Sequence, residues 1–565
     1  MTMWKRLATR LVTRPVARLA DDERGAIAVQ FALLLIPIAI LTFGLIDISR
    51  ASVQRRQLQD ALDAATLMAA RSTATTNADL DTIGDAALAT EMSGLGVTLT
   101  ATNSTFALGD NNTVVGTIQN VVIKPIISNL WSNKDTPVSA TSTVMRSVNK
   151  LEVALVLDNT GSMASSLGSG GSKIDALITA SKSLVDVLGA AAARATETDA
   201  VKLSVVPFSM TVNVGSSYQG QTWLVGTQPA TYGADNFASG GDRFAYLSNL
   251  SLSWGGCVES RPAPFDISDA APGGADTRTL FVPFFAPDEP DDATVYKSGS
   301  SGSQYRDART VNNGTIYNNW ITRDMGYNGS SSTDWNTRQK AVSKYALSNS
   351  TNKNVNYVIS TAKDSDSDYG PNAGCGIASL LRMTNLRTAA GVSTVKTKLG
   401  QMVATGNTNV AMGAMWGWHT ISPNAPFADG SAYGTRNVTK VIVLLTDGDN
   451  VMSSASNPNK GTYSGYGYAS QGRLLDANNT PINGNSDDED RRDAMDDRQK
   501  KLCTAAKANN VQIYSIGVGV SSHSKAVLQA CATKLDMYYD VTDAAQLTSV
   551  FNTIAGSIQN LRITK

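Results

Sequence analysis

The sequence of 565 residues contains only two histidines, His419 and His523. So little imidazole leaves almost no material for histidine-based catalysis or for a zinc site. Charge of one sign is lacking too, because 48 lysines and arginines face 48 aspartates and glutamates and the formal net charge is zero. No global field therefore favours nucleic acid as a partner.

Cysteine is also scarce, with four residues in the whole chain. An even number is compatible with two disulfide bonds, and four cysteines allow three pairings. A bond between Cys257 and Cys375 would staple the middle of the chain, and a bond between Cys503 and Cys531 would be a local one across a strand. Whether the thiols are oxidised depends on the compartment, which the N-terminus decides.

Long apolar runs are rare, but one lies near the N-terminus. Residues 25–46 are 22 positions without a charge, and as a helix they would span about 33 Å, enough for a ~30 Å hydrocarbon core. A membrane helix tolerates Pro37 better than a soluble helix does. The run is too long for a secretory signal, and no small-x-small site follows it cleanly. We therefore predict a transmembrane helix over 25–46.

The charges that flank this run set its orientation. Residues 1–24 form a basic segment, and far fewer cations follow the run; the two groups are Lys5, Arg6, Arg10, Arg14, Arg18 and Arg24, against Arg50, Arg55 and Arg56. The asymmetry predicts a single-pass protein with a cytoplasmic N-terminus and the bulk of the chain outside. An organellar transit peptide shares the basic composition and is the alternative.

Two segments separate the predicted anchor from the main domain. Residues 47–72 keep a helical apolar stripe, which predicts a helical stalk. Residues 73–150 contain short alternating runs divided by turn residues such as Gly109-Asp-Asn-Asn, which predict a small antiparallel β spacer. No chemistry is visible in this spacer.

The main domain is organised around Asp158-Asn159-Thr160-Gly161-Ser162. This stretch follows the apolar run 151–157, which has the length and β-branched content of a buried parallel strand. A strand that ends in Asp-x-Thr-x-Ser puts one carboxylate and two hydroxyls on a single loop. Such hard oxygen donors suit Mg²⁺, Mn²⁺ or Ca²⁺.

Two pieces far downstream add further oxygen donors. Gly406-Asn407-Thr408-Asn409 opens a helix with one more hydroxyl, and the apolar run 441–445 ends in Thr446-Asp447-Gly448. Ligands of open α/β sheets collect outside the carboxyl ends of the strands. We therefore predict a divalent-cation site whose members are Asp158, Thr160, Ser162, Thr408 and Asp447. Each fragment alone would be an ordinary capping turn or β-turn.

In this order the three pieces resemble the von Willebrand factor type A domain and its metal-ion-dependent adhesion site. The resemblance implies an α/β fold with a Rossmann-like, doubly wound, mostly parallel sheet over 151–565. It implies that the hydroxyls of Thr160 and Ser162 bind the ion directly, that the two aspartates act partly through water, and that Thr408 joins in some states. It also implies a protein partner whose acidic side chain fills an open coordination position.

The N-terminal run carries a second resemblance. Arg24-Gly25-Ala26-Ile27-Ala28-Val29-Gln30 is similar to the start of the TadE/TadG-like proteins of the tight-adherence (Flp) pilus system. Pilin-like members are cut after a glycine and carry a glutamate five residues into the mature chain. Here the residue at that place is Gln30, which favours an uncut anchor in a bacterial inner membrane. The fate of Gly25 stays open.

Two long polar stretches interrupt the predicted type A domain, an inserted lobe at 213–383 and a loop at 450–486. Compact domains rarely carry structureless loops of such length, so the lobe should fold locally. Trp254-Gly-Gly-Cys257 and Phe281-Val-Pro-Phe-Phe in the lobe resemble signatures of the TadG group. Both stretches leave the carboxyl ends of strands, so we expect them to crown the metal site.

These observations favour a binding module over an enzyme. The leading hypothesis is a membrane-anchored, outward-facing pilus assembly or adhesion protein that binds a pilus or envelope component through its cation. The alternatives are a metal-assisted envelope hydrolase and a passive structural anchor of the pilus machinery. Against the hydrolase, the sequence offers no nucleophile beside a base and no recognisable pair of acids.

Overall fold

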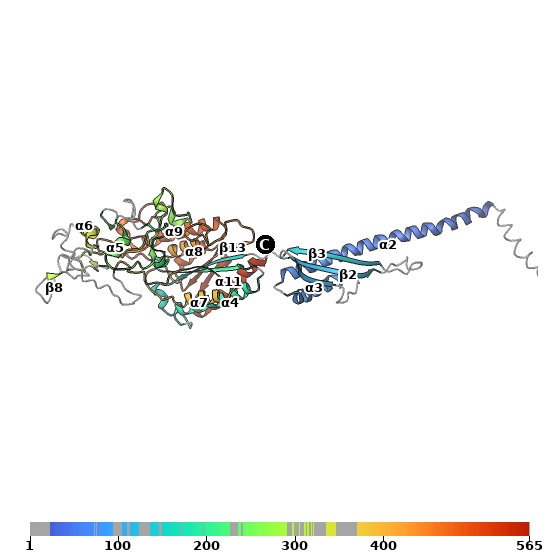
Figure 1. Cartoon of the computed structure of the whole chain (residues 1–565), viewed down its shortest axis with the longest axis horizontal. Coiled ribbons are helices and arrows are strands. Elements are labelled where there is room, and N and C mark those ends of the chain that lie inside the picture. Colours follow the sequence, from blue (N-terminus) through green and yellow to red (C-terminus); the bar gives the residue numbers. More distant parts are fainter. Residues whose placement is uncertain are drawn as a thin grey trace, which may run out of the picture. The chain divides into compact units, whose positions relative to one another are not determined.

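A computed structural model gives the structure of the chain (Figure 1). It describes residues 23–93, 104–123, 136–145, 150–225, 236–290 and 370–563, apart from gaps of one to three residues, together with short segments between 297 and 345. The chain forms two compact units, Met1–Ser147 and Val148–Lys565. The basic segment predicted over 1–24 lies outside the described residues except for its last two.

The first unit begins with one long helix, α2 (Glu23–Arg71), which runs through the apolar stretch without a break at Pro37. Its first half exposes large apolar side chains throughout, among them Phe31, Leu33, Leu34, Ile36 and Leu41. By length and composition the part from Gln30 onward could cross a membrane.

The second half of α2 lies in a hydrophobic core. Leu58, Leu62 and Ala65 are buried there. They pack with a second helix and a three-stranded antiparallel sheet, namely α3 (Asn77–Met92), β1 (Ser104–Gly109), β2 (Thr113–Ile123) and β3 (Thr136–Met145). The segment predicted as a stalk is thus one wall of a small α/β unit.

The helix α3 differs from the β-only spacer predicted over 73–150. Leu80, Leu88 and Met92 form its buried stripe. Its N-cap is Thr76, whose Oγ1 accepts a hydrogen bond from the backbone N–H of Asp79. The stripe is short and includes Gly84, so it gives only a weak helical period in the sequence.

The second unit is built on a six-stranded sheet with the strand order β12-β5-β4-β13-β14-β15. Its strands are β4 (Lys150–Asp158), β5 (Val201–Phe208), β12 (Leu381–Asn385), β13 (Val438–Thr446), β14 (Val511–Val518) and β15 (Tyr538–Val541). Only β12, at the edge, is antiparallel to its neighbour. The unit is therefore mixed α/β with a mostly parallel sheet, and β12 takes the last residues of the predicted lobe.

Helices cover both faces of this sheet (Figure 1). One face packs on α4 (Lys173–Ala193), α7 (Ala389–Leu399) and α11 (Leu547–Ile563). The other face packs on α8 (Val410–Ile421), α9 (Asp488–Ala508) and α10 (Ser522–Cys531). The central strand β4 is buried on both sides, with Leu155 toward the first group and Val156 toward the second. Helix α4 is also long and apolar enough to span a membrane, but here it is a core helix.

The inserted lobe shares the core on the α8 side of the sheet. Phe281 packs against Trp416 of α8 in a tilted arrangement, with ring centroids 4.7 Å apart. The short elements between β5 and β12 are β6 (Val212–Asn213), α5 (Arg243–Asn249), β7 (Cys257–Val258), β8 (Lys297–Ser298), β9 (Gln304–Tyr305), β10 (Thr310–Val311), β11 (Gly314–Thr315) and α6 (Trp335–Lys340). The lobe is therefore an extension of the α/β core.

Two disulfide bonds are present, Cys257–Cys375 and Cys503–Cys531. Of the three pairings that four cysteines allow, this is the one with a staple in the lobe and a local bond. The first bond closes the lobe across 118 residues, and the second joins α9 to α10.

Candidate metal centre

Asp158 is the last residue of β4, and its side chain is fully buried. Its Oδ1 accepts hydrogen bonds from the backbone N–H of Thr160 at 2.8 Å and from Thr160 Oγ1 at 2.6 Å. Its Oδ2 accepts one from Thr446 Oγ1 at 2.7 Å. The carboxylate is thus fixed by its own turn and by the end of the neighbouring strand β13.

Asp447 follows β13 and meets the same turn from the other side. Ser162 Oγ donates to Asp447 Oδ1 at 2.6 Å, across 285 residues of sequence. Thr160 Oγ1 and Ser162 Oγ are 3.0 Å apart. Four of the five predicted residues therefore form one connected chain of oxygen atoms, because β4 and β13 are parallel neighbours that end at the same edge.

Thr408, the fifth predicted residue, lies on a segment that touches this turn through the backbone. The N–H of Gly161 donates to the carbonyl of Gly406 at 2.9 Å, and the N–H of Thr405 donates to the carbonyl of Asn159 at 2.7 Å. Thr408 itself is buried, and its carbonyl accepts from the N–H of Val451 at 2.9 Å. The structure brings the segment to the site, but the contacts that hold Thr408 are made by its backbone.

Burial shapes the electrostatics of the two carboxylates. Burial, and after it the charge of Asp447, raises the pKa of Asp158 to about 6. Hydrogen bonds from Thr160 and Thr446 act in the opposite direction. The site thus concentrates negative charge in a place that water reaches poorly, which is an arrangement that a bound cation would stabilise.

Besides Thr446, whose hydroxyl donates to Asp158, sequence reasoning missed Lys173. This first residue of α4 is buried, and its Nζ donates to Asp447 Oδ2 at 2.8 Å. A lysine at a helix start adds nothing to a periodic pattern, so the apolar stripe of α4 gave no sign of it. The usable signal was its position, since a cation at a helix N-terminus opposes the helix dipole.

The donor set fits a hard divalent cation. Hydrogen bonds link two carboxylates and two hydroxyls in a chain, and every atom of this set that could bind a cation is oxygen. Between them in sequence, Asn159 has a buried Oδ1 that lacks a hydrogen-bond partner within the described part of the chain. The residues present therefore suit Mg²⁺, Mn²⁺ or Ca²⁺ better than a soft metal.

A second polar cluster, formed by Asp493, Asp496 and His523, is linked through Asn450 to the loop that follows Asp447. Asn450 Nδ2 donates to Asp496 Oδ1 at 2.7 Å, and His523 Nε2 lies 2.6 Å from Asp496 Oδ2. Potential ligand atoms of Asp493, Asp496 and His523 all lie within 4.8 Å of one another. Arg492 already pairs with Asp493 at 2.9 Å. The cluster therefore has internal partners for its charges.

His419, the other histidine, is fully buried on α8. Burial and the nearby Arg261 guanidinium hold its pKa well below the usual range. Its ring contacts the rings of Phe281 and Trp416. This histidine therefore belongs to the packed core around α8.

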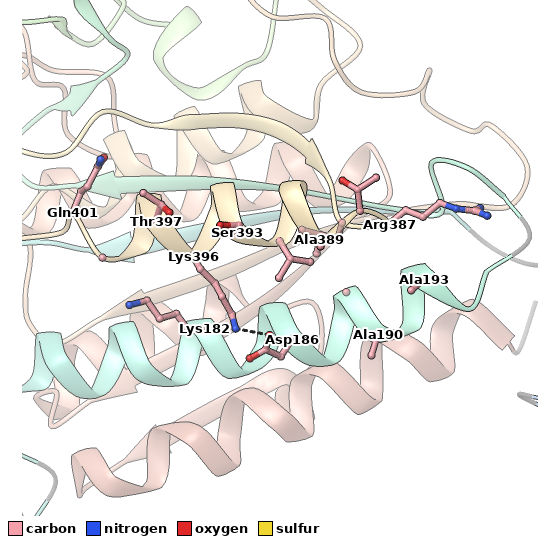
Figure 2. Close-up of a pocket in the computed structure, with 15 residues that line it drawn as sticks. Lys182, Asp186, Ala190, Ala193, Arg387, Ala389, Ser393, Lys396, Thr397 and Gln401 are labelled. Atoms are coloured by element: carbon pink, nitrogen blue, oxygen red, sulfur yellow. Dashed lines mark ion pairs between the residues drawn. The ribbon is translucent and has the colours of Figure 1, made fainter.

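A groove on the described surface lies elsewhere, between α4 and α7 (Figure 2). Its volume is about 960 Å³. Gly189 and Val392 are among its lining residues, and Lys396 of α7 pairs with Asp186 of α4 at 2.5 Å (Figure 2). None of the five predicted site residues lines this groove.

The expectation that both insertions crown the site is met in part. The loop that begins at Asn450 contacts the Thr408 segment through Val451, and Asn450 Oδ1 accepts from the N–H of Val410 at the start of α8. The lobe joins this loop where the N–H of Ser260 donates to the carbonyl of Gly465 at 2.8 Å.

Comparison with known families gives one match, which covers the N-terminal helix. Residues 25–72 match the Tad family, described as Flp pilus-assembly TadE/G-like. No curated protein matches the sequence. The match thus covers the first part of the first unit, and it does not extend to the second unit.

Comparison with solved structures returns bacterial pilus proteins among its matches. The pilus adhesin SpaC from Lactobacillus rhamnosus GG is 11% identical with a TM-score of 0.33, and the match covers 81% of this chain and 34% of SpaC. The PilB minor pilin from Streptococcus sanguinis is 10% identical with a TM-score of 0.30, covering 81% of this chain and 77% of PilB. The vWF domain of the type V pili tip protein Mfa5 from Porphyromonas gingivalis is 10% identical with a TM-score of 0.29, covering 74% and 97%.

This chain therefore spans about a third of the length of SpaC. At these identities and TM-scores the likeness carries no inference about function.

Proposed function

We propose that this chain is a membrane-anchored, outward-facing protein of a Flp-type pilus system that binds a protein partner through a divalent cation. In this proposal the second unit is a type A domain with a doubly wound sheet. Asp158, Thr160, Ser162 and Asp447 hold the cation, and Thr408 lies beside them. When bound, the cation supplies a coordination position that takes a carboxylate oxygen from the partner.

The observation that carries the proposal is the hydrogen bond from Ser162 to Asp447. It closes two distant segments onto one oxygen cluster, at the strand ends where α/β sheets bind ligands. The hydroxyls of Thr160 and Ser162 are already aligned toward the carboxylates, so little reorganisation is needed before they act as ligands. Neutral hydroxyl ligands also leave a bound ion electrophilic enough to accept another anion.

Two observations support the anchor and the pilus context. Residues 25–72 match the Flp pilus-assembly family, and the first half of α2 exposes an apolar surface on all sides. A helix that is apolar all round requires an apolar environment. We therefore place residues 25–46 in a bacterial inner membrane, with the remainder of the chain outside the cytoplasm.

Calorimetric titration of the full chain in detergent with magnesium chloride tests the metal centre. The wild type should bind one ion at the cluster, and the double variant Asp158→Ala/Asp447→Ala should lose that binding. The double variant Asp493→Ala/Asp496→Ala is the control, since it removes the same charges from the neighbouring cluster. Equal binding by the wild type and the Asp158/Asp447 variant would remove the mechanism.

Partner capture separates the binding module from the two alternatives. The full chain should retain envelope or pilus components in Mg²⁺ and release them in EDTA. A passive anchor would lose melting temperature in EDTA without a change in capture. A metal-assisted hydrolase would cleave generic ester or peptide substrates in the presence of Mg²⁺.

A further inference from the structure

Lys173 lies where the helix itself disfavours it. It is the first residue of α4, after the N-cap Ser172, and the unpaired N–H groups of a helix start carry positive partial charge. Its side chain is nevertheless turned inward, with 11% of its surface exposed. Lysines are almost never buried without a partner. The partner here is the fully buried carboxylate of Asp447, at 2.8 Å.

The backbone around Lys173 fixes this arrangement. Its N–H donates to the carbonyl of Ser165 at 3.0 Å, and Ser166 pairs with Ser172 in a β-bridge. The turn after Ser162 therefore returns directly to Lys173. One loop thus carries both a predicted ligand hydroxyl and an ammonium group, and the two contact different oxygens of Asp447.

Counting charges shows what the ammonium does. Asp158 and Asp447 supply two carboxylates, and Lys173 supplies one positive charge in contact with one of them. A divalent cation at the same oxygens would be repelled by this charge, and it would compete with the ammonium for Asp447 Oδ2. Such interactions are strong at short range in a partly buried site.

We propose that Lys173 is an internal counter-ion that sets the cation affinity of this centre. Lys173 lowers the affinity for divalent cations, and its ammonium leaves Asp447 when a cation binds. This inference rests on the proposed function, because it takes the oxygen cluster to be a cation site. Because the ammonium of Lys173 competes with the cation for Asp447, the centre fills only at higher concentrations of divalent cation.

The variant Lys173→Met removes the charge and keeps most of the apolar stem. Titration of the full chain with magnesium chloride should show an affinity at least about tenfold tighter than that of the wild type, which corresponds to about 1.4 kcal/mol. Lys182→Met, farther along the same helix in the α4–α7 groove, is the matched control and should change the affinity less than about twofold. Unchanged or weaker binding by Lys173→Met overturns the proposal.

A measurement on the wild type covers the case in which Lys173→Met does not fold. Labelling with an amine-reactive reagent, read by mass spectrometry, should modify Lys173 severalfold faster in saturating magnesium chloride than in EDTA. Lys182 serves as the internal reference. Equal or slower labelling of Lys173 in Mg²⁺ overturns the proposal.

The two proposals fail in different ways. If the wild type and Lys173→Met bind Mg²⁺ with the same affinity, Lys173 has no role but the metal centre stands. If Lys173→Met binds Mg²⁺ and the wild type does not, the role of Lys173 is supported, but the wild-type protein does not function through a bound cation. The absence of binding in both proteins overturns both proposals.

Discussion

The two ends of the strand pair β4–β13 bury carboxylates in opposite ways. At the amino end, Glu152 lies opposite Lys440 in the register, and the two side chains form a buried ion pair. Ser431 adds donors from its N–H at 2.8 Å and its Oγ at 2.6 Å. At the carboxyl end, Lys173 pairs with Asp447, while Asp158 accepts hydrogen bonds from Thr160 and Thr446.

This difference separates a structural charge from a functional one. At the Glu152 end, the carboxylate and the ammonium of Lys440 neutralise each other, and Ser431 also donates to the carboxylate. An added cation would therefore gain little there. At the Asp158 end, only Asp447 contacts an ammonium group, and burial followed by the charge of Asp447 raises the pKa of Asp158. The Glu152–Lys440 pair, which lies on the same two strands, therefore serves as an internal control for tests of the metal centre.

The largest effect is expected at the balanced end. Lys440→Met leaves Glu152 buried without its counter-ion, so the free energy of unfolding should fall by about 3–5 kcal/mol. Urea unfolding of the full chain measures this loss. The affinity for Mg²⁺ should stay the same, and a change in affinity would show that the two ends are not independent.

An intermediate effect is expected from pH. The pKa of Asp158 in the folded chain, about 6, lies above the ordinary 3.8, so the folded state holds this proton more tightly than the unfolded state does. The contribution of Asp158 to stability is therefore present at low pH and is lost as the pH rises from about 4 to about 6. A cation needs the ionised carboxylate, so the affinity for Mg²⁺ should fall about tenfold for each pH unit below about 6.

Calorimetry between pH 5 and 7.5 reads this dependence on the full chain. Melting temperatures with and without Mg²⁺ should diverge as the pH rises through this range. Binding that does not change with pH would show that Asp158 is not a ligand.

The smallest effect is expected at Thr408, whose contacts to the site run through the backbone. Thr408→Ala removes one hydroxyl, and we expect a loss of affinity of about fivefold, the value of a single modest hydrogen bond. Thr394→Ala, which removes a hydroxyl bonded within α7, is the matched control. An effect as large as that of Asp447→Ala would make Thr408 a principal ligand.

Much of the fold could be predicted because strand and helix patterns are local. Residues 151–157 are apolar apart from Glu152, and they lie in the strand β4 of the sheet. The position of Asp158 and Asp447 at strand ends followed from the same patterns. The hydrogen bond that joins Ser162 to Asp447 follows from parallel pairing of β4 and β13, which the sequence-level rule for α/β sheets anticipates.

What was missed depends on contacts between distant segments. Lys173 belongs to the site only because α4 begins beside Asp447, which no pattern within α4 encodes. Thr446 was treated as part of a turn, although its hydroxyl holds Asp158. The lobe was expected to fold by itself, but Phe281 packs on Trp416 of α8. These contacts required the three-dimensional arrangement.

The most direct test of the central claim is anomalous diffraction from crystals of the full chain grown with manganese chloride. The account predicts a single strong Mn²⁺ peak within ligand distance of Ser162 Oγ and bounded by Asp158 and Asp447. A crystal with a peak only at Asp493, Asp496 and His523, or with no peak at the ends of β4 and β13, would contradict it.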